Sequence, residues 1–180
     1  MRVSRSKFAE REYIDHILAC MMAPNSEALR LSLDYGLRIG DVLSMPRSAL
    51  ESGTYSLMEE KTGKRRVVRL SQLHIDACMR IAGRYFVFEH RLTPKKHRTR
   101  QAVYKDLKRI CKVFRVDGIS PHSARKVYAV EKLRKSGDLA KVQRALNHSD
   151  PEITLLYALA DHISACLLYT SPSPRDMRRS

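Results

Sequence analysis

The stretch Ile119–Gly137, ISPHSARKVYAVEKLRKSG, contains the clearest helix signal in the sequence. Ser120 is a good N-cap, Pro121 fits a first helical turn, and the closing glycine can end the helix in the left-handed conformation. His122 and Arg125 are three positions apart, and this spacing places both side chains on one side of the helix. Taken alone, each could be an ordinary capping or surface group, so their meaning depends on the segments around them.

Both neighbours of this stretch are also helical in pattern. Residues 91–112, RLTPKKHRTRQAVYKDLKRICK, contain nine Lys or Arg and one Asp. The first part predicts a loop. The second part predicts a helix with a basic outer side, because its apolar residues fall on one face: Val103, Leu107, Ile110 and Val113. On the other side, residues 138–146 and 150–160 predict two helices with Asp caps.

The N-terminal half predicts helices and one hairpin. A first helix with an apolar face should end at Pro24-Asn25, and a second should run from Ser26 to Gly36. A short helix over 38–45 precedes two strand-like runs, 53–60 and 65–70, around a KTGK turn. A helix over 71–81 and a short strand over 85–88 complete the pattern. The expected fold class is mainly α with a small antiparallel β-sheet, an α+β arrangement.

The charge balance indicates a polyanionic partner. The 180 residues include 34 Lys or Arg and 19 Asp or Glu, a net charge of +15. Nucleic acid is the first candidate and an anionic membrane surface the second. No apolar run approaches the roughly 20 residues that span a bilayer, and the N-terminus lacks the apolar core of a signal peptide, so we expect a cytoplasmic protein. Four scattered cysteines without a CxxC pair predict reduced, mostly buried thiols.

Several short motifs follow one another in a specific order along the chain. YGLRIGDVLSM contains Arg38 and Asp41, KTGKRRVVRL begins with Lys61, and PHSARK follows. LNHSDPEITLLYA then places Tyr157 nine residues after His148. In this order the chain resembles the catalytic domain of the tyrosine recombinases, the phage integrase family, from near residue 8 to about residue 161.

The resemblance implies the catalytic-domain fold of that family and attack of a tyrosine hydroxyl on a DNA phosphodiester, with a 3′-phosphotyrosyl intermediate. It implies a catalytic set of Arg38, Lys61, His122, Arg125, His148 and Tyr157, with Asp41 orienting the cations. Two guanidiniums suit the oxygens of a pentavalent phosphorus. No metal or cofactor is expected. The expected partner is double-stranded DNA, on which a homo-oligomer, a tetramer, would recombine sites; a phage or bacterial mobile element is the expected source.

The basic balance also predicts phosphate contacts outside the catalytic set: Lys64, Arg65, Lys95, Lys96, Arg98, Arg100, Lys105 and Lys126. Asn147 stands where the family has Gly, and Lys126 where it often has His. We expect residues 1–165 to form the catalytic domain without the family's N-terminal core-binding domain. Residues 166–180, rich in Ser, Pro and Arg, predict a disordered tail that resembles translated adapter sequence, and whether it is native stays open.

Three other functions remain open at this point. A non-catalytic DNA-binding remnant would explain the missing domain, although such a remnant should lose its catalytic residues early. A type IB topoisomerase-like enzyme would use the same chemistry without strand exchange. A basic RNA-binding protein is less well supported, because four Phe and no Trp give no aromatic platform.

Overall fold

The computed structural model describes residues 11–60 and 63–146. In chain order these residues form α1 (Arg11–Ala19), α2 (Ala23–Tyr35), α3 (Ile39–Leu43), α4 (Ser48–Glu51), β1 (Thr54–Met58), β2 (Arg65–Arg69), α5 (Gln72–Met79), α6 (Arg100–Val113), α7 (Pro121–Ser136) and α8 (Leu139–Leu146). The predicted fold class is confirmed: the chain is mainly helical, with one two-stranded antiparallel sheet.

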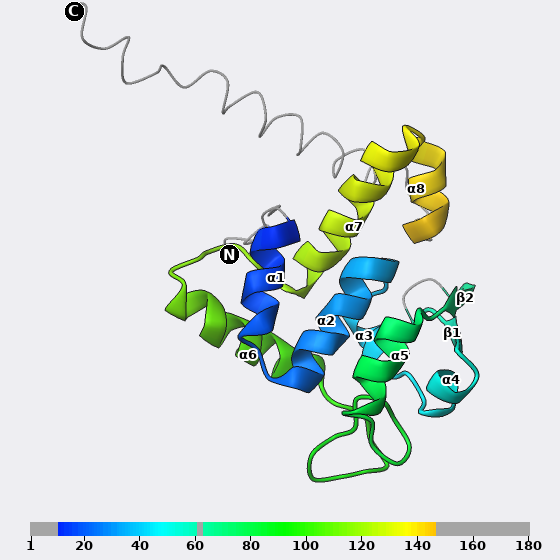
Figure 1. The fold of residues 1–180 in the computed structure, drawn as a ribbon, viewed down its shortest axis with the longest axis vertical. Helices are drawn as coiled ribbons and strands as arrows, with labels where there is room; N and C mark the ends of the chain where they lie inside the picture. The colour runs from blue at the N-terminus through cyan, green and yellow to red at the C-terminus, as the bar shows by residue number, and fades with distance from the viewer. Residues whose placement is uncertain (1–10, 61–62, 147–180) are drawn as a thin grey trace, which may run out of the picture.

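Helix α2 is the centre of the core. It packs against α1, α3, α5, α6 and α7, and its buried residues point in several directions rather than along one stripe. Figure 1 shows the β1–β2 hairpin with α4 on one side of α2 and α6 on the other. Helices α7 and α8 lie next to each other and carry the chain back towards the hairpin side. The central position of α2 means that its C-terminal end is enclosed by other elements.

The two predicted strand-like runs form the antiparallel hairpin β1–β2. Thr54 pairs with Arg69 and Met58 with Arg65. Tyr55 and Leu57 of β1 face the core, and Val68 of β2 joins them. The same alternation continues past the end of β1. The side chain of Glu59, two positions after Leu57, therefore also points inward.

Three helix predictions need adjustment. Helix α1 ends at Ala19, before the predicted end at Pro24-Asn25. Helix α2 begins at Ala23, not Ser26, because Pro24 occupies its first turn, where a missing N–H leaves no hydrogen bond unmade. In α6, Val103, Leu107 and Ile110 are buried as predicted, but Val113 is 71% exposed. It is the last residue of the helix, and the core position at that end belongs to Cys111.

The predicted strand over 85–88 is wrong. This segment forms a single bridge, Phe86 to Pro46, within a loop. Val87 and Phe88 are fully buried, which explains the apolar run. The opposite segment contains a proline, whose backbone has no N–H for a longer ladder. Helix α4 was not expected. The predicted helix over 150–160 and the tail 166–180 lie outside the described residues.

Candidate active site

The site is built around the end of α2. Gly36 follows α2 with a φ of +63° and donates its N–H to the Ser32 carbonyl. A Cβ at Gly36 would lie 2.3 Å from Cδ1 of Tyr128, so α7 packs directly on this glycine. The left-handed turn sends the chain into α3, with Arg38 at its N-cap. The turn therefore places the Gly36 carbonyl beside α7 and brings Arg38 close behind it.

Arg125 joins three segments at this turn. The residue is 4% exposed on α7. One guanidinium nitrogen, Nη1, donates to the Gly36 carbonyl, and the other, Nη2, donates to the Leu146 carbonyl at the end of α8. Both of these acceptors are neutral carbonyl oxygens, which are weaker hydrogen-bond acceptors than the charged oxygens of an anion.

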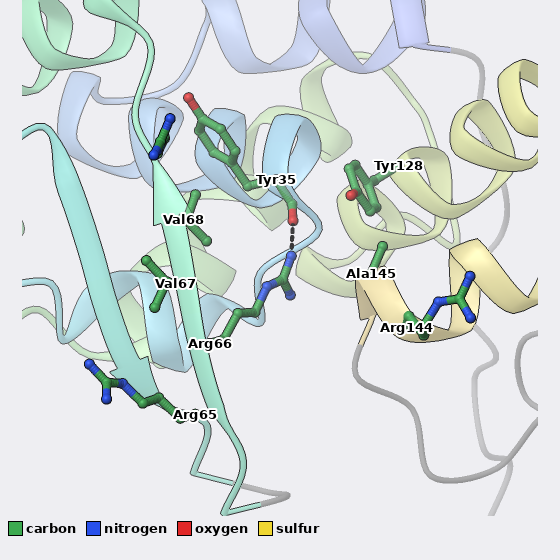
Figure 2. A pocket seen from close by; sticks show the side chains of 9 residues that line it. Tyr35, Arg65, Arg66, Val67, Val68, Tyr128, Arg144 and Ala145 are labelled. Atoms are coloured by element: carbon green, nitrogen blue, oxygen red, sulfur yellow. Dashed lines mark hydrogen bonds between the residues drawn. The ribbon is translucent and has the colours of Figure 1, made fainter.

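Arg38 is held by a buried carboxylate. Its Nη1 pairs with Oε2 of Glu59, whose side chain is fully buried, while the Arg38 side chain is 17% exposed. Arg66 of β2 approaches the other carboxylate oxygen, with Nη1 3.5 Å from Oε1 of Glu59. Arg66 also donates to the Tyr35 carbonyl, as Figure 2 shows, and to the Gly36 carbonyl at 3.4 Å.

Asp41 is the second buried acid of the site. It is 4% exposed, and its Oδ1 accepts a hydrogen bond from the Glu60 backbone N–H at 3.3 Å. Its Oδ2 has no hydrogen-bond partner in the described part of the chain. Burial raises the pKa of the Asp41 carboxyl, and the negative charge of Glu59 adds to this. The Glu60 N–H and the charges of Arg38 and Arg125 oppose the rise in this pKa.

These contacts define the arginine cluster: Arg38, Arg66 and Arg125 with Asp41 and Glu59. Three of the predicted site residues, Arg38, Asp41 and Arg125, come together in it from distant parts of the chain. His122 lies one helical turn before Arg125 at the start of α7, with an exposed side chain. The predicted residues Lys61, His148 and Tyr157 lie outside the described residues.

Sequence reasoning missed Glu59 and Arg66. The signal for Glu59 was present, because in the run YSLME it is in phase with Tyr55 and Leu57, which face the core. A carboxylate on the buried face of a strand requires a cationic partner, and the arginine-rich second strand supplies one. Arg66 could not be selected from its neighbour Arg65 without knowing which face of β2 is buried.

The residues predicted to contact phosphates have side chains that are either exposed or partly buried. Most have exposed side chains: Lys64, Arg65, Lys95, Lys96, Arg100 and Lys105. Arg100 pairs with Glu60 and lies over Gly40, so it is next to the arginine cluster. Arg98 instead donates from Nε to Oδ1 of Asn25 at 2.7 Å, and burial lowers its pKa. Lys126 is half-buried on α7.

A pocket of about 410 Å³ lies between β2 and the α7–α8 pair. Tyr35, Tyr128 and Arg66 line it, and Figure 2 shows the Arg65 and Arg144 guanidiniums pointing away from each other. The cations around this pocket therefore do not converge on one point. Within residues 11–60 and 63–146, no helix is long and apolar enough to cross a membrane.

The sequence of this chain matches one protein-family model and several known proteins. The family model described as the phage integrase family matches residues 7–162. A tyrosine recombinase XerA from Saccharolobus solfataricus is 28% identical over 144 residues, covering 77% of this chain and 47% of the relative. The integrase of Escherichia phage P2 is 25% identical over 151 residues, covering 84% of this chain and 42% of that protein. The chain thus spans about half the length of these relatives.

Solved structures show the same fold. The catalytic domain of bacteriophage HP1 integrase matches with a TM-score of 0.65 at 19% identity, over 92% of this chain and 96% of that one. The XerH site-specific recombinase bound to its difH substrate matches with a TM-score of 0.66 at 22% identity, over 85% of this chain and 50% of that one. The arrangement of helices around the hairpin is therefore that of a tyrosine recombinase catalytic domain.

Proposed function

Since the chain belongs to the phage integrase family, we propose that it is a site-specific recombinase or integrase that cleaves and rejoins double-stranded DNA. The observation that carries the proposal is the arginine cluster. The Gly36 turn brings Arg38 and Arg125 together, although one precedes α3 and the other lies on α7. These are two of the residues that the sequence motifs select for contact with the reacting phosphate.

The arginine cluster suits a pentavalent phosphorus. Negative charge builds up on the non-bridging oxygens as the nucleophile attacks, and guanidinium forks stabilise it. Arg125 donates to two neutral carbonyls, and a phosphate is a stronger acceptor than either. Asp41 interacts electrostatically with both Arg38 and Arg125, and we assign it the role of orienting these cations without touching the substrate.

The remaining steps are assigned to residues chosen from the sequence. The Tyr157 hydroxyl attacks phosphorus and loses its proton, and His122 relays that proton or holds the phosphate. His148 donates a hydrogen bond to a non-bridging oxygen. Lys61 protonates the departing 5′-oxygen as general acid. The phosphotyrosyl bond keeps the energy of the broken bond, so the reverse attack by a 5′-hydroxyl rejoins the strand without ATP.

The proposed partner is double-stranded DNA, which is supported by the structure of the Tn1549 transposon integrase, a protein of similar fold, in complex with a circular intermediate DNA. We further propose that a tetramer forms on DNA during recombination and that the protein acts in the cytoplasm of a bacterial cell. A topoisomerase-like activity would give cleavage and relaxation without exchange between two sites.

The test is covalent trapping on a suicide substrate, a duplex nicked so that the short 5′-hydroxyl fragment diffuses away after cleavage. We expect a protein–DNA adduct that survives denaturation, forms without added metal, and is strongly reduced in Arg38→Ala. Exchange of strands between two duplexes separates a recombinase from a relaxing enzyme. Tight DNA binding without any adduct would support the inactive remnant instead.

A further inference from the structure

A buried glutamate connects the arginines of the site. Glu59 follows β1, and its side chain has no exposed surface. Oε2 accepts from Arg38, and Oε1 lies 3.5 Å from Nη1 of Arg66. One carboxylate therefore fixes an arginine from the start of α3 and an arginine from β2 at the same time.

The connection continues to Arg125 through the backbone. Arg66 donates to the Tyr35 carbonyl and, at 3.4 Å, to the Gly36 carbonyl. The Gly36 carbonyl also accepts from Nη1 of Arg125. Hydrogen bonds thus connect Arg38 to Arg125 by way of Glu59, Arg66 and the Gly36 carbonyl.

The charges of the cluster explain why a glutamate is placed here. Three guanidiniums in a largely buried site repel one another, and each is costly without a counter-ion. Glu59 and Asp41 reduce this repulsion, and three cations against two carboxylates still leave a positive site for a phosphate. Because Glu59 keeps Arg66 as a partner, Arg38 can turn towards a phosphate without leaving the carboxylate unpaired.

The backbone of the same residue closes the hairpin turn. The Glu59 N–H donates to the Lys64 carbonyl at 3.0 Å, and the Glu59 carbonyl accepts from the Gly63 N–H at 2.8 Å. Gly63 has a φ of +63°, as the turn requires. The proposed general acid, Lys61, is two positions after Glu59 in the sequence. Glu59 therefore belongs both to the arginine cluster and to the base of the hairpin turn.

From these contacts we propose that Glu59 is a positioning residue for catalysis. Its carboxylate orients Arg38 directly and Arg125 through Arg66 and the Gly36 carbonyl. This inference rests on the proposed function, because that function supplies the phosphate on which the arginines act. Glu59 itself faces the arginines and does not touch DNA.

The first measurement is single-turnover cleavage of the suicide substrate by the full chain at saturating protein. Glu59→Gln keeps the shape of the side chain and removes its charge. We expect cleavage to slow about tenfold or more, the scale of a lost charge-assisted hydrogen bond, while the Kd for DNA changes less than about threefold. Glu51→Gln is the matched control, since it removes an equal charge from a side chain that is 63% exposed and pairs with Arg47.

A double-mutant cycle separates positioning from a general effect on the fold. If Glu59 acts through Arg38, Glu59→Gln should slow Arg38→Lys little further, and the two losses should not add. Arg66→Met should also slow cleavage, again without adding fully to Glu59→Gln. Fully additive losses, or a rate for Glu59→Gln equal to that of Glu51→Gln, would overturn the inference.

One readout does not depend on cleavage. In the free, 15N-labelled protein, the Nη–H protons of Arg38, which Glu59 holds, should exchange with water about tenfold faster in Glu59→Gln than in the wild type. An unchanged exchange rate would contradict positioning by Glu59 even if cleavage by Glu59→Gln were slower. Absence of an adduct in the wild type, with faster exchange in Glu59→Gln, would instead contradict the proposed function and leave the positioning of Arg38 established.

Discussion

Arg125 is more deeply buried than a surface phosphate contact would be. It is 4% exposed, and its two carbonyl partners lie at the Gly36 turn and at the end of α8. The side chain thus has a fixed direction before any substrate arrives. A guanidinium oriented in advance does not need to be reorganised in the transition state, and this is the main electrostatic contribution to catalysis.

Replacing Arg125 by Lys should separate charge from geometry. Lys keeps the positive charge and loses the planar fork, so it cannot hold the Gly36 and Leu146 carbonyls and a phosphate together. We expect cleavage of the suicide substrate to fall by about 10²-fold or more, with DNA affinity largely kept. Parallel titrations of binding and cleavage provide the check. Equal losses in both would make Arg125 an anchor for DNA rather than a catalytic group.

At this scale the sequence motifs selected three members of the arginine cluster and missed the other two. Arg38, Asp41 and Arg125 were selected by motif spacing, and the fold brings them together. Glu59 was not selected, because no motif contains it and its meaning depends on burial. Which of two neighbouring arginines turns inward, Arg65 or Arg66, also depends on the packing of β2, which local sequence does not specify.

At the scale of elements, Asp106 ties α6 to the start of α2. It is 7% exposed and accepts hydrogen bonds from the Met22 N–H at 2.9 Å and from Nδ2 of Asn25 at 2.8 Å. Arg109 adds a contact at 2.7 Å. Burial opposes ionisation, but these bonds, led by that from Asn25, hold the pKa of the Asp106 carboxyl below its ordinary value.

Asp106→Asn should therefore destabilise the protein in a pH-dependent way. At neutral pH we expect the free energy of unfolding to fall by about 1–3 kcal/mol, because the Met22 and Asn25 donors then face an amide. The folded-state pKa is lowered, so this stabilisation is present above the ordinary Asp pKa of about 4 and is lost as the pH falls through the folded value. Urea titrations of the wild type and of Asp106→Asn across pH measure the difference in the free energy of unfolding. Asp76→Asn, whose exposed carboxylate accepts from Gln72, is the control and should change little.

Elements with their own start and stop signals were predicted well. Helix α7 has Ser120, Pro121 and Gly137 at its ends, and the structure confirms all three roles. The error over 85–88 arose because a short apolar run can be buried as a loop as well as a strand. Only the partner segment, with Pro46, decides between them, and that partner lies far away in the sequence.

At the scale of the whole molecule, the net charge of +15 must arise mainly from cationic side chains on the surface. The exposed cations of the loop before α6 and of the α6 outer face, Lys95, Lys96 and Lys105 among them, supply part of it. If they neutralise phosphates, binding of DNA should release counterions and depend steeply on salt.

A salt titration tests this surface. Each phosphate contact should add about 0.9 to the slope of log K against log salt concentration. We expect Lys95→Gln, Lys96→Gln and Lys105→Gln each to reduce the slope by about that amount. Lys135→Gln, a loss of equal charge on α7, serves as the control. A wild-type slope that corresponds to only one or two contacts would contradict a basic DNA-binding face on this part of the molecule.

The central claim is that one tyrosine becomes covalently joined to DNA, and adduct mapping tests it most directly. Tyr157→Phe removes one oxygen, so the fold and DNA binding should persist. The account predicts that Tyr157→Phe forms no adduct on the suicide substrate, while Tyr128→Phe and Tyr169→Phe still form it. Peptide mapping of the wild-type adduct should place the phosphodiester on the fragment that contains Tyr157. An adduct that survives Tyr157→Phe, or one mapped to another tyrosine, would contradict the account.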